Sequence, residues 1–357
     1  MTNTEPPDWQ ASVDVDRLTR WMNALRLGRG VIADARLLTG GTQNLILRFS
    51  RGGRGFVLRR PPARPRPQAD ATIAREARVL AALAGSTVPH PRLIAACEDA
   101  SVLGAAFYLM EPVEGFNPSG RPLPALHAAD PALRHAMGLS AVDALLRLGE
   151  VDAEAVGLAD FGKPQGFLER QAARWRSQLD GYAEHAGWPG ADGLPGVAAL
   201  GDWLEKHRPE PSAPGVLHGD FHLSNLMFRY DGPAVAAVID WELATLGDPL
   251  LDLGWLLATW PDASGQGAGT IHITPWSGFP STDELIAHYR ERSPRDLSAI
   301  DWYAALAGYK LGILLEGSYA RACAGKAPRE TGDKHHVSAQ RLIQRALARI
   351  DSTGHTA

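Results

Sequence analysis

The residues best suited to chemistry gather in two short stretches past the middle of the chain. The stretch 218–225 carries a carboxylate, an imidazole and a carboxamide at Asp220, His222 and Asn225, and a second carboxylate, Asp240, follows soon after. Phosphoryl transfer needs a carboxylate that orients the attacking hydroxyl and accepts its proton. It also needs oxygen ligands for the magnesium ions that bridge the nucleotide phosphates. These residue types favour phosphoryl transfer, with Asp220 as base and Asn225 and Asp240 as metal ligands.

The spacing of these residues makes the prediction more specific. Asp220 and Asn225 are separated as the Asp and Asn of a protein-kinase catalytic loop are. His222 follows the base by two residues, where protein kinases often carry a Lys that touches the transferred phosphate. Asp and Asn in loops are also common turn and cap residues, and an isolated His is usually structural. For His222 both interpretations stay open.

The segments around these residues predict how they are held. Apolar runs at 226–228 and 235–239, separated by an Asp-Gly turn, predict a β-hairpin between the two polar stretches. A helix is expected to follow, with Asp248 at its N-cap and Pro249 in its first turn. Asp252 lies inside the apolar part of that helix and therefore needs a buried partner, for which we expect a backbone N–H of the loop 218–225.

The N-terminal third of the chain indicates an antiparallel sheet that follows an amphipathic helix over 13–27. Strands are expected at 35–38, 45–49 and 56–60, and later at 92–97 and 107–110. Between the first two lies a loop with Gly40, Gly41 and Thr42, where backbone N–H groups can approach a phosphate. A plain hairpin turn would have the same composition, so both interpretations remain.

A cation and a helical carboxylate are expected to work as a pair in this region. Arg59 lies on the third predicted strand, where kinases place the cation that pairs with the α- and β-phosphates. Glu76, on a helix predicted over 72–84, is placed to be its partner. A solvated helical Glu would look the same. Arg offers a planar fork and Lys a point charge, so the two are not interchangeable at such a site.

A short segment after the last strand predicts a hinge that contacts the adenine. The carbonyl of Glu111 and the N–H of Val113 are the two useful groups, and Pro112 between them lacks only an N–H that is not needed. We therefore expect an N-lobe over 1–111, a hinge over 112–118 and a C-lobe over 119–357. The C-lobe is predicted to be mostly helical, with helices at 132–148, 165–179, 197–207, 282–291, 297–316 and 337–350.

Composition is that of an ordinary globular protein. The net charge of −4 provides no basic field for nucleic acid, and the only two cysteines lie too far apart in sequence for a metal motif. No apolar stretch is long enough to span a bilayer, and the first residues lack the features of a signal peptide. A reducing, cytoplasmic location is expected. The last helix carries Arg341, Arg345 and Arg349 on one stripe, which we interpret as a solvated face.

Several motifs together resemble a known family. They are GGTQN (40–44), FVLRRPP (56–62), REARVL (75–80), FYLMEPVEG (107–115), HGDFHLSN (218–225) and IDWELATLGDPLLDLGWLL (239–257). In this order the chain resembles the aminoglycoside phosphotransferase-like, choline-kinase-related small-molecule kinases, nearest to the subgroup associated with acyl-CoA dehydrogenases. The resemblance implies an α+β, bilobal protein-kinase-like fold, ATP or GTP as donor, and Mg²⁺.

The resemblance also limits the choice of function. It implies a small-molecule hydroxyl acceptor, and the subgroup points to a hydroxyacyl thioester or another metabolite. An antibiotic such as an aminoglycoside or a macrolide is the alternative acceptor, and basic residues over 321–349 weigh against a polycation. A pseudokinase would be expected to lack Asp220, Asn225 or Asp240, and none is missing. The acceptor and the oligomeric state stay open.

Overall fold

The computed structural model describes residues 9–38, 44–62, 65, 67–210, 212–269 and 271–352. The chain divides into two compact units. The N-terminal unit comprises Met1–Glu114 with Ile239–Glu242, and the C-terminal unit comprises Gly115–Val238 with Leu243–Ala357. The four residues Ile239–Glu242, among them Asp240, lie at the end of the predicted hairpin and just after it, and they belong to the N-terminal unit.

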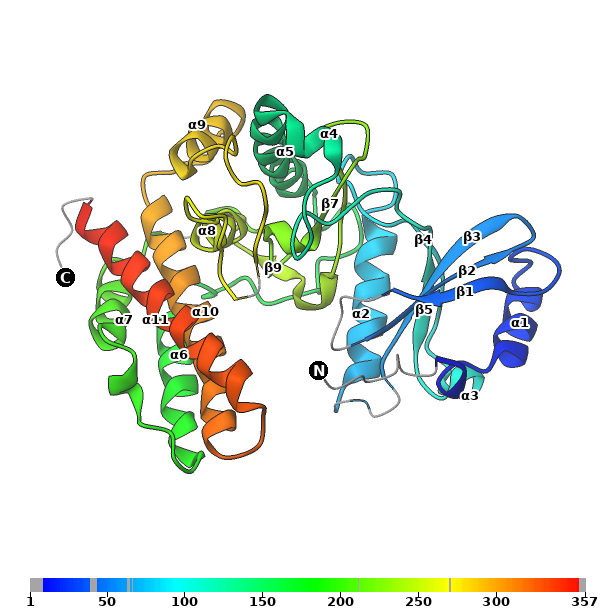
Figure 1. Cartoon of the computed structure of the whole chain (residues 1–357), viewed down its shortest axis with the longest axis horizontal. Coiled ribbons are helices and arrows are strands. Elements are labelled where there is room, and N and C mark those ends of the chain that lie inside the picture. The colour runs from blue at the N-terminus through cyan, green and yellow to red at the C-terminus, as the bar shows by residue number, and fades with distance from the viewer. Residues whose placement is uncertain are drawn as a thin grey trace. The chain divides into compact units, whose positions relative to one another are not determined.

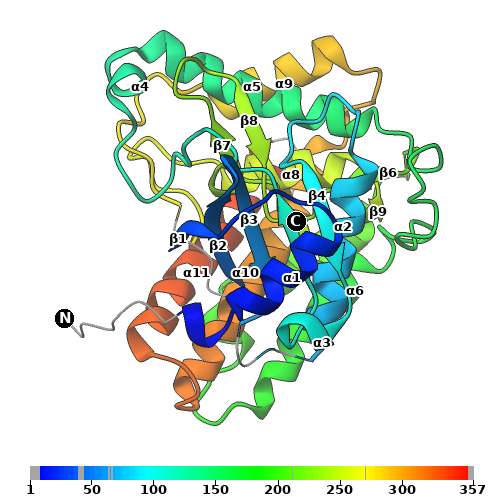
Figure 2. The same ribbon diagram turned by 90° about the vertical axis from the view of Figure 1, so that its right-hand side faces the viewer.

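The N-terminal unit is built on a five-stranded antiparallel sheet of order β1-β2-β3-β5-β4. Helix α2 packs against β3, β4 and β5 and lies beside β4 in Figure 2. All five predicted strands and both predicted helices are present. Their bounds are β1 (Ala33–Leu37), β2 (Leu45–Arg51), β3 (Arg54–Arg60), β4 (Leu93–Cys97), β5 (Phe107–Met110), α1 (Val15–Ala24), α2 (Ala69–Ala82) and α3 (Ala100–Leu103).

Strand alternation places Arg59 on the functional face of this sheet. Phe56 and Leu58 belong to a buried apolar cluster that includes Leu18 and Met22 of α1. Successive side chains of a strand point to opposite faces. Arg59 therefore points away from the α1 side, toward the face that α2 covers.

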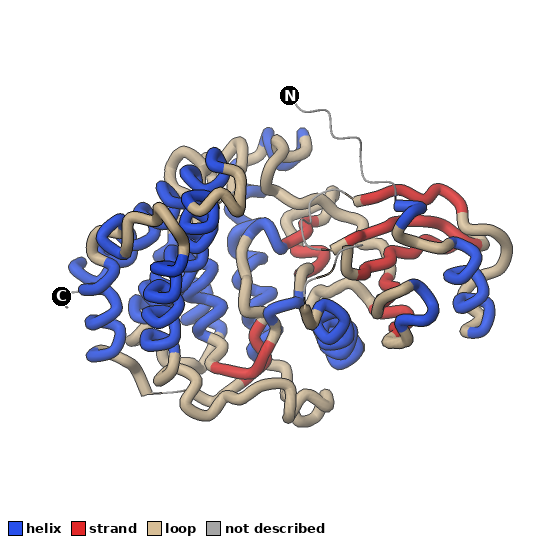
Figure 3. The backbone as a smooth tube through the Cα atoms, turned by 90° about the horizontal axis from the view of Figure 1, so that it is seen from below, coloured by secondary structure: helices blue, strands red, loops and turns tan. Residues whose placement is uncertain are grey.

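The C-terminal unit is mainly helical, and Figure 3 shows its helices in blue. Helix α10 packs along α11 and α8, and it also contacts α6 and α7 (Figure 1). A Cβ at Gly254 of α8 would lie 2.5 Å from the Tyr303 carbonyl carbon of α10, so this close packing requires glycine. The helices are α4 (Ala125–Ala129), α5 (Pro131–Gly149), α6 (Gln171–Asp180), α7 (Val197–Lys206), α8 (Leu250–Thr259), α9 (Thr282–Arg292), α10 (Ile300–Cys323) and α11 (Arg329–Ser352).

Two short antiparallel sheets frame the central loop. The predicted hairpin is confirmed as β7 (Leu226–Phe228) and β8 (Val235–Val238). A second pair, β6 (Gly215–Leu217) and β9 (Thr245–Gly247), was not expected from the sequence. Its strands are only three residues long, too short to show alternation.

Helix ends differ from the sequence predictions in three places. Helix α6 begins at Gln171, six residues later than expected, and α10 runs on to Cys323. Helix α11 begins at Arg329, where i,i+4 ion pairs such as Arg329–Asp333 replace an apolar pattern. Asp248 also precedes the assigned N-cap of α8, Pro249, by one residue, although its carboxylate accepts the Leu250 N–H at 3.0 Å.

The α+β class, with an antiparallel sheet plus helices and a largely helical C-terminal part, is confirmed. Among the described helices, none combines the length and apolar character that a membrane crossing needs.

Candidate active site

The predicted site residues fall into two groups, one in each unit. Arg59, Glu76 and Asp240 come together in the N-terminal unit, and Glu111 and Val113 lie in the same unit. The C-terminal unit brings together Asp220, His222 and Asn225. Gly40, Gly41 and Thr42 lie outside the described residues.

The predicted pairing of Arg59 with Glu76 is confirmed. The Arg59 Nε lies 2.8 Å from a Glu76 carboxylate oxygen, and its Nη2 lies 2.6 Å from Oδ1 of Asp240. The planar guanidinium thus bridges two carboxylates, which a single ammonium nitrogen could not do in the same geometry. Tyr108 on β5 completes the group, because its hydroxyl donates at 2.8 Å to Oε2 of Glu76, the oxygen that also faces the Arg59 Nε.

Burial governs the charges in this cluster. Glu76 is 1% exposed, and this burial raises its pKa to about 7 even though Arg59 and the Tyr108 hydroxyl act to lower it. Burial alone would lower the pKa of Arg59, but Tyr108, Glu76 and Asp240 outweigh it, and the pKa stays above its ordinary value. Arg59 is therefore a permanent cation among acidic neighbours.

Asp240 is held in an unusual backbone conformation. Its φ is 68°, in the left-handed region that few residues other than glycine adopt. Such a conformation persists only where the surroundings impose it, and it is often found at functional sites. Oxygen atoms of Asp240, Glu242 and Glu76 lie within 4.8 Å of one another. Carboxylate oxygens are ligands that Mg²⁺ prefers, so the donor set of this cluster fits a magnesium ion.

The loop that bears Asp220 is held in place by hydrogen bonds to the buried carboxylate of Asp252. The carboxylate of Asp252 accepts the backbone N–H of His218 at 2.6 Å and of Gly219 at 2.9 Å, as the sequence predicts. Gly219 has φ 83°, and a Cβ there would lie 2.4 Å from the carbonyl oxygen of Leu243. Only glycine therefore fits this turn. Burial raises the pKa of Asp252, while His218 and the two N–H groups act to lower it.

Three donors surround the carboxylate of Asp220. Oδ1 accepts the indole N–H of Trp255 at 3.0 Å and lies 3.3 Å from Nε2 of His222. Oδ2 accepts the side-chain amide of Asn225 at 3.0 Å. Burial acts to raise the pKa of Asp220, but hydrogen bonds from His222 and Asn225 outweigh it and leave the pKa below its ordinary value. The carboxylate is thus ionised and oriented at neutral pH.

His222 and Asn225 each keep one side-chain polar atom that has no hydrogen-bond partner among the described residues. Asn225 uses its amide nitrogen on Asp220, and its carbonyl oxygen has no partner among the described residues. An amide oxygen of this kind is a suitable magnesium ligand. The Nδ1 atom of His222 is buried and has no hydrogen-bond partner in the described part of the chain.

The predicted hinge groups are available for hydrogen bonding. The Glu111 N–H donates to the Arg92 carbonyl at 2.9 Å. Within the described residues, neither the Glu111 carbonyl nor the Val113 N–H has a hydrogen-bond partner. These are the two groups that the adenine prediction uses.

Sequence reasoning missed two aromatic members of the site. Trp255 lies thirty-five residues after Asp220, and Tyr108 thirty-two residues after Glu76. No local spacing could have linked either pair. The only signal was that a buried indole N–H or phenol needs a polar partner.

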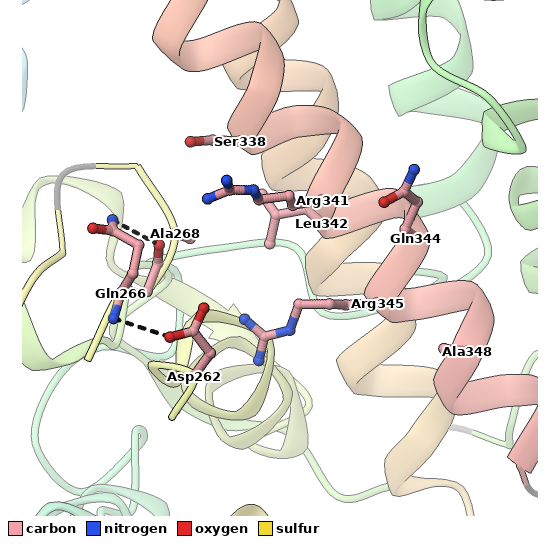
Figure 4. Close-up of a pocket in the computed structure, with 10 residues that line it drawn as sticks. Asp262, Gln266, Ala268, Ser338, Arg341, Leu342, Gln344, Arg345 and Ala348 are labelled. Atoms are coloured by element: carbon pink, nitrogen blue, oxygen red, sulfur yellow. Dashed lines mark hydrogen bonds between the residues drawn. The ribbon is translucent and has the colours of Figure 1, made fainter. Parts of the chain in front are cut away.

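A separate hollow of the C-terminal unit involves the basic stripe of α11 (Figure 4). The cavity, about 390 Å³ in volume, lies between α11 and the segment 262–268. Arg341 and Arg345 are exposed, as the prediction of a solvated stripe requires, although Arg345 also donates to the Trp260 carbonyl at 3.0 Å. Arg349 departs from the prediction, because it is half-buried and pairs with Asp301. Arg341 has no side-chain partner among the described residues.

Comparison with known proteins identifies the family. The model of the phosphotransferase enzyme family matches residues 34–285. The chain belongs to this family. The phosphotransferase is 31% identical to acyl-CoA dehydrogenase family member 10 of Mus musculus, over 93% of this chain and 31% of the mouse protein. It is also 31% identical to family member 11 of Homo sapiens, over 97% of this chain and 45% of the human protein. The chain thus spans less than half the length of these relatives.

Solved structures agree with the kinase-like fold. A Ralstonia eutropha protein provisionally assigned as an aminoglycoside phosphotransferase has a TM-score of 0.75 and 31% identity, covering 94% of this chain and 98% of that one. A ternary complex of APH(4)-Ia with ADP and hygromycin B has a TM-score of 0.56 and 16% identity, covering 91% and 97%, which shows a shared fold. The resemblance stated from the motifs is confirmed: the chain belongs to the phosphotransferase enzyme family and has the kinase-like fold.

Proposed function

We propose that this phosphotransferase moves the γ-phosphate of ATP or GTP to a hydroxyl group of a small molecule. The environment of Asp220 is the observation that carries the proposal. Neutral donors from Trp255 and Asn225 orient an ionised carboxylate, while its pKa is held below the ordinary value.

In the proposed reaction Asp220 acts as general base. It accepts a hydrogen bond from the acceptor hydroxyl and takes its proton as the oxygen attacks. The oxygen–phosphorus bond to the γ-phosphate forms while the bond between that phosphorus and the β,γ-bridging oxygen breaks, so ADP or GDP leaves. His222, two residues on, is proposed to stand near the transferred phosphate.

The nucleotide is assigned to residues of the N-terminal unit. Arg59 is proposed to pair with the phosphates, with Glu76 orienting it. The Glu111 carbonyl and Val113 N–H are proposed to hydrogen-bond the adenine. Gly40, Gly41 and Thr42 remain predicted phosphate contacts.

The proposed magnesium ligands are the carbonyl oxygen of Asn225 and the carboxylate of Asp240. Both atoms are of the type that Mg²⁺ selects, and Glu242 adds a further carboxylate beside Asp240. When bound, magnesium would neutralise charge on the nucleotide phosphates.

For the acceptor we propose an acidic or thioester-bearing metabolite such as a hydroxyacyl thioester. The support is that two relatives matching nearly the whole chain are described as acyl-CoA dehydrogenase family members. An antibiotic is the alternative, because a solved neighbour of the same fold holds hygromycin B.

A nucleotide-consumption screen with mass detection of phosphorylated product tests the proposal. The acceptors are hydroxyacyl thioesters, hydroxy acids, amino sugars, macrolides and amino alcohols, each with Mg²⁺ and ATP or GTP. We expect product with at least one hydroxylated metabolite and none with Asp220→Asn. Absence of nucleotide binding by calorimetry in the presence of Mg²⁺ would refute the kinase assignment.

A further inference from the structure

Lys310 lies near the proposed base, Asp220, with its ammonium over the rings of two tryptophans. Lys310 of α10 places its Nζ 4.4 Å from the ring centroid of Trp255 and 5.5 Å from that of Trp175 on α6. Trp255 is the residue whose indole N–H donates to Asp220. A single indole therefore contacts the ammonium of Lys310 through its face and the proposed base through its edge.

The ammonium of Lys310 has no protein partner that matches its needs. An ammonium has three N–H donors, yet the half-buried side chain of Lys310 makes no hydrogen bond or ion pair with any other described residue. The faces of the two indoles attract the positive charge but do not replace the oxygen acceptors of an anion, so the three N–H donors are left to solvent. Burial lowers the pKa of Lys310. The more distant charges of Asp220 and Asp252 act in the opposite direction but do not outweigh burial.

A second cation flanks the same aromatic wall. The guanidinium of Arg174 lies over the ring of Trp175, 5.2 Å from its centroid, and its charge acts to lower the pKa of Lys310. Arg174 is exposed and has no side-chain partner among the described residues. Two residues along α6, Arg176 by contrast pairs with Asp202 at 2.7 Å. Lys310 and Arg174 thus place two positive charges beside Trp175, and neither side chain has an ion-pair partner within reach among the described residues.

We propose that Lys310 and Arg174 form an anion-binding subsite for the phosphate acceptor, immediately beside Asp220. The inference rests on the proposed function, because it assumes that Asp220 receives the acceptor hydroxyl. An anion would supply the acceptors that the ammonium lacks, and charge-assisted hydrogen bonds are the strong ones. Because one indole separates Lys310 from Asp220, the acceptor carries its carboxylate or phosphate only a few bonds from its hydroxyl.

The subsite also accounts for selection against other acceptors. A polycationic aminoglycoside would bring amines toward Lys310 and Arg174, and like charges so placed disfavour binding. A neutral hydroxylated compound would leave the ammonium unpaired. A short hydroxy acid or hydroxy phosphate satisfies both ends. The subsite therefore narrows the proposed acceptors to the acidic ones, because a thioester carries no charge at this place.

Paired acceptors provide the test. Short-chain 2-, 3-, 4- and 5-hydroxy acids are compared with their methyl esters, which keep the hydroxyl and remove the charge. With the whole protein, we expect kcat/KM for the best acid to exceed that for its ester by about 10- to 100-fold, mainly through KM. In Lys310→Met, which keeps the length of the apolar part of the side chain and removes the ammonium, this ratio should fall to near one, and Lys310→Arg should restore most of it.

Two further variants separate the subsite from a merely structural role. Arg174→Gln, at an exposed position that folding tolerates, should lower the acid-to-ester ratio several-fold. The matched control Arg176→Gln removes the same charge from the same helix and should leave the ratio unchanged. Equal use of acid and ester by the unaltered protein, or an equal loss of both in Lys310→Met, would overturn the subsite while leaving phosphoryl transfer intact. If no acceptor of any charge is phosphorylated, the proposed function fails, and the subsite with it.

Discussion

Asp220 and Asp240 are the same residue type in two different environments. Asp240, in the N-terminal unit, binds the guanidinium of Arg59 from a left-handed backbone conformation. Asp220, in the C-terminal unit, is held by an indole, an amide and an imidazole. A carboxylate held by a full cation is suited to charge balance and metal binding, whereas one held by weak donors can still accept a proton.

A buried carboxylate supports each site, Glu76 in the N-terminal unit and Asp252 in the C-terminal unit, and these two also differ in the groups that hold them. Glu76 meets Arg59 and the Tyr108 hydroxyl, and Asp252 meets two backbone N–H groups. Glu76 therefore links a strand to a helix through charge, whereas Asp252 holds a loop in place through directional hydrogen bonds. We infer that the N-terminal cluster balances the negative charge of the nucleotide phosphates, whereas the C-terminal cluster orients the carboxylate of the proposed base.

The largest expected effect comes from Asp220→Asn. The substitution keeps the shape and most hydrogen bonds but removes the proton acceptor, so turnover should fall by about 10²–10⁴. Nucleotide affinity, measured by calorimetry with Mg²⁺, should remain close to that of the unaltered protein, because the phosphates are assigned to other residues.

Asp240→Asn is the matched variant for that experiment. It removes a proposed carboxylate ligand and a partner of Arg59, so Mg²⁺-dependent nucleotide binding should weaken along with turnover. If both variants bind the nucleotide equally well, the division of roles between the two aspartates is wrong.

Arg59→Ala should have the next largest effect. It leaves the buried Glu76 without its cation, which costs about 3–5 kcal/mol of stability, and it should abolish most of the thermal shift caused by nucleotide. Arg59→Lys keeps the charge but not the fork that spans Glu76 and Asp240. Full activity of the Lys variant would contradict the need for a planar group.

Arg48→Ala is the control for Arg59. Arg48 lies on the neighbouring strand β2 and pairs with the exposed Glu114 at 2.8 Å. An exposed pair of this kind contributes less than about 1 kcal/mol, so the melting temperature should change little.

The Glu76→Gln variant tests, through the pH dependence of stability, whether burial raises the pKa of Glu76. The pKa of Glu76 is raised to about 7 from an ordinary 4.5. Its contribution to stability is therefore fully present below the ordinary value and is lost as pH rises through about 7, by up to about 3 kcal/mol. Relative to the Gln variant, the unaltered protein should lose melting temperature between pH 5 and pH 8. Parallel melting curves across this range would contradict the raised pKa.

The smallest effect is expected from Trp255→Phe. Asp220 loses one donor, so its pKa should rise and turnover should fall by roughly tenfold. Trp260→Phe is the control, since that indole donates instead to the Pro280 carbonyl at 2.9 Å. The control should lose stability without a comparable change in turnover.

The linear sequence determined those features that depend on neighbours along the chain. Alternating apolar residues specified β2, and the Asp-Gly turn specified the hairpin of β7 and β8. The separation of Asp220 from Asn225 was enough to suggest which two side chains share one loop, because a short loop brings its own polar groups together. The partner of Asp252 was predictable because a buried carboxylate requires donors, and the loop N–H groups were the nearest along the chain.

Only the tertiary structure decided which distant residues meet. The indole of Trp255 on α8 reaches Asp220 on the central loop, and the packing of α8 against α10 brings Lys310 to Trp255. Nothing in the local spacing encodes either contact. Pairing of β6 with β9 was equally hidden, since three residues cannot display a period. The basic stripe of α11 had the pattern of a solvated face, yet Arg345 and Arg349 found partners across the fold. Periodicity reports which face of an element is apolar, but the partner of a polar side chain depends on which elements pack together.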